Sequence, residues 1–85
     1  MHDQLVMALS LAVRDRREHL QVSQSELARR SGLHRSYIGD LERGARSISV
    51  KNLSRLASAL GLTASSLLRL AEKKMASEGP FQAKV

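Results

Sequence analysis

Hydrophobic residues recur at intervals of three and four along most of the chain, which is the spacing of one helical face. From Asp3 to Leu20 one face carries Leu5, Leu9, Ala12, Val13, Arg16 and Leu20. Similar stripes consist of Leu27 and Ala28, of the apolar residues from Val50 to Leu60, and of Ala64, Leu67, Leu68 and Ala71. Strand-like alternation and internal repeats are absent from the sequence. The pattern therefore predicts an all-α fold.

Capping residues and glycines divide these stripes into five helices. Ser23 to Glu26 has the form of a capping box, in which Ser23 accepts from an amide and Glu26 reaches back. Gly32, Gly44 and Gly61 stand where helices end, while Ser49 and Thr63 stand where helices begin. The expected helices span 3–20, 24–31, 35–43, 50–60 and 64–75. Together they predict a compact five-helix bundle.

The length of 85 residues allows one domain. We expect this domain over residues 1–74 and a flexible C-terminal tail over 75–85. The chain contains no cysteine, which excludes disulfides and cysteine-bound metals. Neither a cofactor nor a small-molecule ligand is inferred. The apolar run from Leu5 to Val13 is too short to span a membrane and lacks a preceding basic segment, so we expect a cytoplasmic protein.

Positive charge is concentrated in the middle of the chain. The segment from Arg29 to Arg55 contains seven basic residues and only two acidic ones, Asp40 and Glu42. This middle third of the chain therefore holds five of the six net positive charges. Such a cluster indicates a polyanionic partner. An ordinary solvated surface is the alternative that charge alone leaves open.

The segment 35–43 combines a narrow apolar anchor with a broad polar face. At about 100° per residue, one arc carries Arg35, Ser36, Gly39, Asp40 and Arg43, whereas Ile38 and Leu41 point the other way. Small residues among arginines let a helix approach a groove floor, and an arginine near its start can bind guanine O6 and N7. The alternative is an ordinary amphipathic surface helix.

A family resemblance becomes evident at these residues. The stretches SQSELARRSGL, IGDLERG and LSRLASALGLTASSL resemble the helix-turn-helix regulators of the lambda repressor, Cro and XRE family. The resemblance covers roughly Leu9 to Leu70. Within the family, LHRSYIGDLERGARSIS is most similar to the controller proteins of restriction–modification systems. A bacterial or phage origin follows from the resemblance.

The resemblance implies a DNA-binding role for each matching position. Residues placed to read base edges are Arg35, Ser36 and Asp40. Residues placed to bind the DNA backbone are Gln24, Tyr37, Arg43, Arg46, Ser47 and Lys51. Asp40 can accept from cytosine N4 or orient Arg35 or Arg43. Tyr37 either touches phosphate or sugar or is a half-buried packing ring.

Two further positions have implied structural roles. Glu42 points toward the protein side of its helix, and relatives commonly pair an acid there with an arginine late in the first helix. Arg17 is the matching residue, so we expect a structural ion pair between Arg17 and Glu42. His34 stands where many relatives have a serine or threonine cap, which puts side-chain capping of that helix in doubt.

These observations predict a sequence-specific transcriptional regulator, repressor or activator, that binds a palindromic double-stranded DNA operator as a homodimer. RNA polymerase is a further candidate partner. The alternative is an antitoxin or phage accessory protein that acts mainly through a protein partner. An enzyme is not expected, because no nucleophile elbow, phosphate loop or paired metal-ligand histidines occur.

A single recognition helix reads few base pairs, so a second copy is expected to pair through the last helix. The residues assigned to this dimer interface are Leu67, Leu70 and Ala71. Leu70 projects away from the apolar stripe and is the centre of the expected contact. The alternative is that Leu70 packs on the first helix near Met7 or Leu11.

Overall fold

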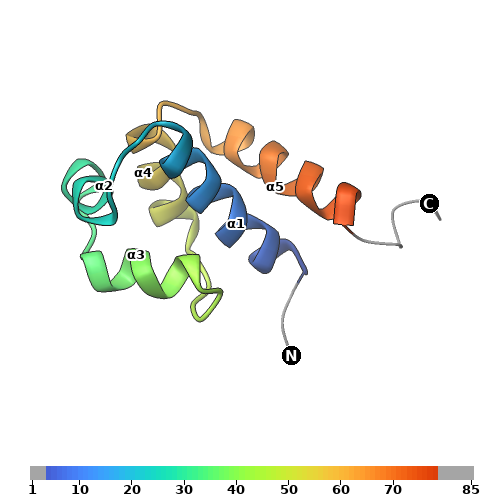
Figure 1. Ribbon diagram of the computed structural model, residues 1–85, viewed down its shortest axis with the longest axis horizontal. Helices are drawn as coiled ribbons and strands as arrows, with labels where there is room; N and C mark the ends of the chain where they lie inside the picture. The colour runs from blue at the N-terminus through green and yellow to red at the C-terminus, as the bar shows by residue number, and fades with distance from the viewer. Residues whose placement is uncertain (1–3, 79–85) are drawn as a thin grey trace.

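The computed structural model describes residues 4–78, which form five helices (Figure 1). In chain order these are α1 (Gln4–His19), α2 (Gln24–Ser31), α3 (Arg35–Glu42), α4 (Val50–Ala59) and α5 (Ala64–Glu78). No strand occurs within residues 4–78, so the all-α prediction is confirmed. The expected range of α2 is matched, and α3 ends one residue early because Arg43 is its C-cap.

Hydroxyl groups cap three helices at the expected positions. Ser23 accepts from the Glu26 amide at 3.0 Å, Ser49 from the Asn52 amide at 3.1 Å, and Thr63 from the Ser66 amide at 3.1 Å. Each bond satisfies one of the amides that a helix start leaves without an intrahelical partner. The Glu26 carboxylate, which was expected to return a bond to Ser23, accepts instead from Arg29 and Arg30.

The turn between α1 and α2 contains a left-handed residue that is not glycine, so no glycine in the sequence marks this turn. Gln21 takes a left-handed backbone conformation with φ of 59°, and the Val22 amide donates back to the Arg17 carbonyl at 3.1 Å. A non-glycine residue in this region costs about 1–2 kcal/mol. Arg17 helps to hold the turn, because its Nη1 donates to the Val22 carbonyl at 2.9 Å.

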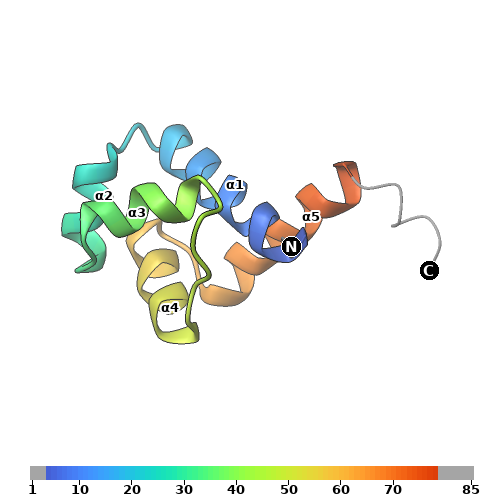
Figure 2. The ribbon, with the colours of Figure 1, turned by 90° about the horizontal axis from the view of Figure 1, so that it is seen from below.

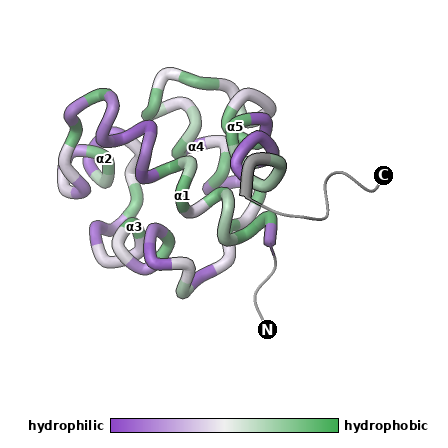
Figure 3. Tube along the Cα trace, turned by 45° about the vertical axis from the view of Figure 1, so that its right-hand side comes forward, coloured by the Kyte–Doolittle hydropathy of each residue, from purple (hydrophilic) through white to green (hydrophobic). Residues whose placement is uncertain are grey.

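The core lies where α1, α4 and α5 meet the inner faces of α2 and α3. Figures 1 and 2 show α1 beside α5, while α2 and α3 lie at the other end of the molecule. The largest apolar side chains with at most 1% exposure are Val13, Leu27, Ile38, Leu41, Leu56, Leu60 and Leu67. Burying each contributes about 1.5–3 kcal/mol relative to exposure. Figure 3 shows hydrophilic positions on α2 and α3 as well as along α1 and α5.

Several residues on the predicted stripes are not in the core. Leu5 is 37% exposed and Val50 is 82% exposed. Arg16, which also lies on the α1 stripe, donates through Nε to the Leu60 carbonyl at 3.0 Å and so satisfies the end of α4.

The last helix is longer than expected. α5 continues to Glu78, and Met75 packs against the core, so the first part of the expected tail is helical. Residues 79–85 of that tail lie outside the described residues, as does Asp3.

Candidate nucleic-acid interface

The outward face of α3 starts with Arg35 and Ser36, whose side chains are exposed. Ile38 and Leu41 lie on the opposite face with 0% and 1% exposure and anchor the helix to the core. Figure 2 looks onto α3, which lies along the surface of the molecule. The first turn of α3 therefore presents polar side chains on a firmly held helix, as entry into a DNA groove requires.

Gly39 departs from the sequence expectation, because it is buried although it lies on the polar arc. A Cβ atom at Gly39 would be 3.4 Å from Arg43 Nη1 and 3.8 Å from Gln24 Oε1. These two polar side chains cover the middle of α3. Both distances are ordinary van der Waals contacts, so an alanine would fit here, and a longer side chain would displace the ends of Arg43 and Gln24.

Asp40 binds two arginines that were predicted to contact the DNA backbone. Arg43 Nη2 donates to Asp40 Oδ1, and Arg46 Nη2 lies 3.9 Å from Asp40 Oδ2. The sequence left open whether Asp40 reads a base or orients an arginine. In the DNA-free protein, Asp40 pairs with Arg43 at the end of α3 and with Arg46 in the following loop.

Tyr37 is half-buried and packs against the core. The Arg46 guanidinium lies over its ring, 5.1 Å from the centroid, which is a cation–π geometry. The Tyr37 hydroxyl is buried and has no hydrogen-bond partner within the described part of the chain. The ring is therefore half-buried and packed, and it positions an arginine beside α3, while a contact of Tyr37 with the DNA backbone stays a prediction.

Arg17 and Glu42 lie together, as the sequence predicted, and Gln24 joins them. Arg17 Nε donates to Glu42 Oε2 at 2.7 Å, and Arg17 Nη2 donates to Glu42 Oε1 at 2.9 Å. Gln24 Nε2 donates to the same Oε1 at 3.0 Å. The Arg17 side chain is 13% exposed and that of Glu42 is 4% exposed. The hydrogen bonds with Glu42 raise the pKa of Arg17 despite the lowering effect of burial. The network joins α1, α2 and α3.

Sequence reasoning missed Arg14, which lies beside this network. A polar cleft of about 170 Å³ is lined by Arg14, Arg17, Glu18, Gln24, Gly39, Glu42 and Arg43. Arg14 Nε donates to Glu18 Oε2 at 3.3 Å, and both side chains are 54% exposed. The cleft brings Arg14 of α1 and Arg43 of α3 to the start of α2. Only the packing of α1 against α3 reveals this, because Arg14 lies far from the motif in sequence.

The loop after α3 carries the remaining predicted backbone contacts. Arg46 and Ser47 are exposed in this loop, and Lys51 is exposed in the first turn of α4. Figure 2 shows the loop running from the end of α3 to the start of α4. Gly44 begins the loop with φ of 74°, and a Cβ there would lie 2.6 Å from Met7 Sδ. Both the conformation and the contact require glycine.

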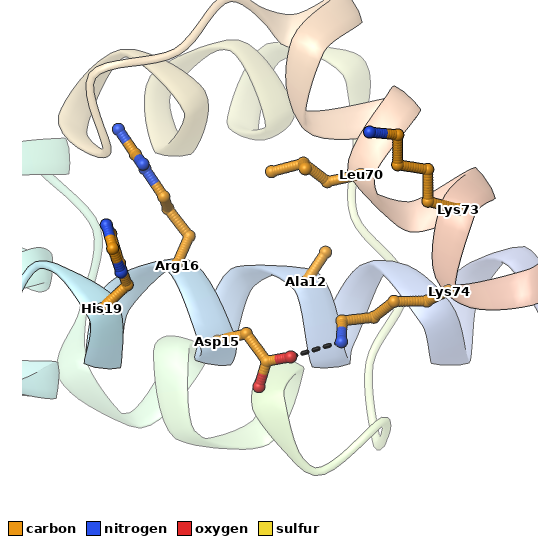
Figure 4. A pocket seen from close by; sticks show the side chains of 7 residues that line it. All are labelled: Ala12, Asp15, Arg16, His19, Leu70, Lys73 and Lys74. Carbon is orange, nitrogen blue, oxygen red and sulfur yellow. Dashed lines mark ion pairs between the residues drawn. The ribbon is translucent and has the colours of Figure 1, made fainter. Parts of the chain in front are cut away.

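The three residues predicted for the dimer interface do not form a common exposed surface in the structure. Leu67 and Ala71 are 0% exposed within the chain, so they offer no surface to a second copy. This corrects their assignment, because α5 uses that stripe to close its own core. Leu70 is half-buried and lines a hollow with Ala12 and other residues of α1. It faces α1 across this hollow (Figure 4).

Two short helices joined by the Gly32 turn, with an outward polar α3 and a cationic loop after it, define a helix-turn-helix DNA-binding domain. A family described as helix-turn-helix matches residues 13–67 of the chain. The chain belongs to this family.

Two proteins, one from a bacterium and one from a bacteriophage, are similar to this chain. Control protein C.BamHI of Bacillus amyloliquefaciens is 45% identical over 47 residues, which are 55% of this chain and 58% of that protein. The ImmF control region 10 kDa protein of Bacillus phage phi105 is 32% identical over 73 residues, which are 86% of this chain and 80% of that protein.

A solved relative has the same fold. The restriction–modification controller protein C.Esp1396I, as a tetramer in complex with its natural 35 base-pair operator, superposes with a TM-score of 0.80. The match covers 85% of this chain and 95% of that chain at 25% identity.

Residues 4–78 contain no group of three or more histidine, cysteine or acidic side chains that could hold a metal ion. None of the helices in this range is long and apolar enough to cross a membrane.

Proposed function

We propose that this protein is a transcriptional regulator that binds a palindromic DNA operator as a homodimer. The observation that carries the proposal is the outward face of α3, where Arg35 and Ser36 are exposed beside a cationic loop. Arg35 is assigned to guanine, because its guanidinium can donate two bonds to O6 and N7. Ser36 and Asp40 complete the base-reading set.

The backbone contacts surround this face. Gln24 stands at the start of α2, where amides and the helix dipole favour a phosphate. Arg43, Arg46, Ser47 and Lys51 extend along the loop and the start of α4. Arg14 enlarges the cationic wall of the polar cleft and is added to the set. When DNA binds, Arg43 and Arg46 leave the Asp40 carboxylate and pair with phosphates of the DNA backbone.

Restriction–modification control is the best-supported biological role. It draws on the similarity to C.BamHI and on C.Esp1396I, which is bound to its operator as a tetramer. The similarity to a phage control-region protein supports a second candidate, an accessory regulator in a phage locus. Both roles place the protein in a bacterial cytoplasm, with RNA polymerase as a further partner, and neither includes an enzymatic activity.

The surface best placed for a second copy is an apolar groove of about 190 Å³ beside the loop after α3. The residues that line it are Leu5, Val6, Leu9, Ser47, Ile48, Ser49, Val50, Leu53 and Leu68. Leu5 and Val50 are the exposed large hydrophobic residues of the described range, and both lie here. A dimer formed at this groove would have to hold both α3 helices toward one face of DNA, about one turn apart, as two-fold operators require.

A pair of charge substitutions tests the dimer surface. Val50→Asp is expected to give a monomer in sedimentation experiments and to weaken operator binding, because the groove would bury an unpaired carboxylate. Leu70→Asp is the matched control on α5 and should leave the dimer intact. If Leu70→Asp dissociates the protein and Val50→Asp does not, the interface lies on α5.

Footprinting on DNA upstream of the protein's own gene tests operator binding directly. Affinity should fall steeply with salt, since each neutralised phosphate contributes a slope of about −0.9 in log K against log salt. A protected site with two-fold symmetry is the expected result. A flat response to salt, or no protection at any concentration, would refute the proposal.

A further inference from the structure

A hollow of about 470 Å³ lies between α1 and α5, outside the DNA-binding surface. Its lining residues, labelled in Figure 4, are Ala12, Asp15, Arg16, His19, Leu70, Lys73 and Lys74. Ala12 is 2% exposed and forms part of the floor, and Leu70 extends across it. The hollow therefore combines an apolar centre with a charged rim.

The hollow opens on the side of α1 away from α3. Met7 and Arg17 mark the α3 side of α1, because Met7 meets Gly44 and Arg17 binds Glu42. At about 100° per residue, Ala12, Arg16 and His19 point roughly the opposite way. Figure 4 agrees, since α1 lies between these side chains and the pale green α3. A molecule in the hollow and DNA against α3 can be bound at the same time.

The rim is mainly cationic. Lys74 pairs with Asp15, which neutralises one side of the hollow. Within residues 4–78, Arg16 and Lys73 take part in no ion pair. Arg16 donates through Nε to the Leu60 carbonyl, but its positive charge is not matched by a carboxylate. A second copy docked here by a two-fold axis would oppose like charges, which disfavours self-association.

We propose that this hollow binds an acidic segment of a partner protein. One large apolar side chain of the segment contacts Ala12 and Leu70, and its carboxylates pair with Arg16 and Lys73. The apolar centre favours a ligand that carries an apolar side chain over a purely ionic one such as DNA phosphate, and the open position between two helices suits a peptide that lies across both. The site is separate from α3, so it links operator-bound protein to another protein.

Peptide selection tests the chemistry of the occupant. Random peptides of about 12 residues displayed on phage are selected against the full chain, with excess duplex DNA present to cover the cationic loop after α3. Enriched peptides should carry one leucine, methionine, phenylalanine or tryptophan flanked by aspartate or glutamate. Enrichment of peptides without acidic residues, or no enrichment, would overturn the proposal.

Affinity measurements with a synthetic selected peptide locate its site on the free protein, independently of DNA binding. Lys73→Glu and Leu70→Ser should each weaken binding about tenfold, because they remove a rim charge and the apolar contact. Arg69→Glu makes the same charge change on α5 at an exposed residue outside the hollow, and should alter affinity less than about twofold. Circular dichroism checks that each variant is folded.

Two outcomes would contradict the site. Equal losses for Lys73→Glu and Arg69→Glu would show that the peptide is attracted only by overall charge. A change in self-association for Leu70→Ser, measured by sedimentation, would show that a second copy occupies the hollow.

Discussion

Removing one member of the Arg17–Glu42 pair should destabilise the protein strongly. The Glu42 carboxylate is 4% exposed and accepts two bonds from Arg17 and one from Gln24. Arg17→Ala leaves that carboxylate with Gln24 alone, and breaking a buried pair in this way costs about 3–5 kcal/mol. Glu42→Ala should cost about 3 kcal/mol, at the lower end of that range, because Arg17 is 13% exposed and keeps the Val22 carbonyl.

The magnitude is large relative to the whole fold. A domain of this size has a free energy of unfolding of about 4–13 kcal/mol. Each single substitution therefore removes a substantial fraction of it, and α3 loses its hydrogen-bonded ion pair with α1. Operator affinity should fall together with stability.

Urea unfolding of both single variants and the double variant gives the coupling free energy between Arg17 and Glu42. We expect about 2–3 kcal/mol. The control cycle uses Glu26 and Arg30 on α2, an ion pair whose side chains are 34% and 42% exposed and whose coupling should be several times smaller. Additive effects of Arg17→Ala and Glu42→Ala, or a coupling no larger than that of the control pair, would refute the reasoning.

Three further predictions concern charge. Arg35→Ala should cost about 1–3 kcal/mol of binding free energy on the operator and relax the preference at one base pair, whereas Lys51→Ala should weaken binding to operator and random DNA alike. Equal losses on both DNAs for Arg35→Ala would show that Arg35 contacts a phosphate. Asp40→Asn should strengthen binding to random duplex in gel-shift titrations, because Arg43 loses a competing carboxylate, and unchanged or weaker binding would contradict this. Arg29 and Arg30 lower the pKa of Glu26 to about 2, so its stabilising effect should be complete above about pH 4.5 and disappear as the pH falls toward 2. Urea midpoints of wild type and Glu26→Gln across that range check this, and a pH-independent difference would contradict it.

Local signals in the sequence account for most of the helix boundaries. A cap such as Ser23 acts on an amide three residues away, and Gly32 ends α2 by its own backbone conformation. Both effects lie within one helical turn and need no knowledge of the rest of the chain. The turn at Gln21 was not foreseen, because a non-glycine residue adopts the left-handed region only when the packing around it requires this.

The candidate site likewise has features that the sequence predicts and features that depend on how the helices pack. The face of α3 that carries Arg35 follows from helical periodicity, and the link from Arg17 to Glu42 followed from the family resemblance. The burial of Gly39 and the approach of Arg14 to α2 depend on how α1 and α2 lie over α3. Side chains from separate helices meet there, and the spacing of residues within one helix does not predict such contacts.

Sequence by itself determined which faces are apolar, and tertiary structure decided which of them are covered. Leu67 and Val50 look equally suited to a core in the periodic pattern. Leu67 is 0% exposed on α5, a helix that packs against α1 and α4, whereas Val50 is 82% exposed beside the loop after α3. The difference arises because burial of an apolar side chain depends on whether another helix lies over it. That is a property of the packed bundle, and it moves the proposed dimer contact from α5 to the groove beside α3.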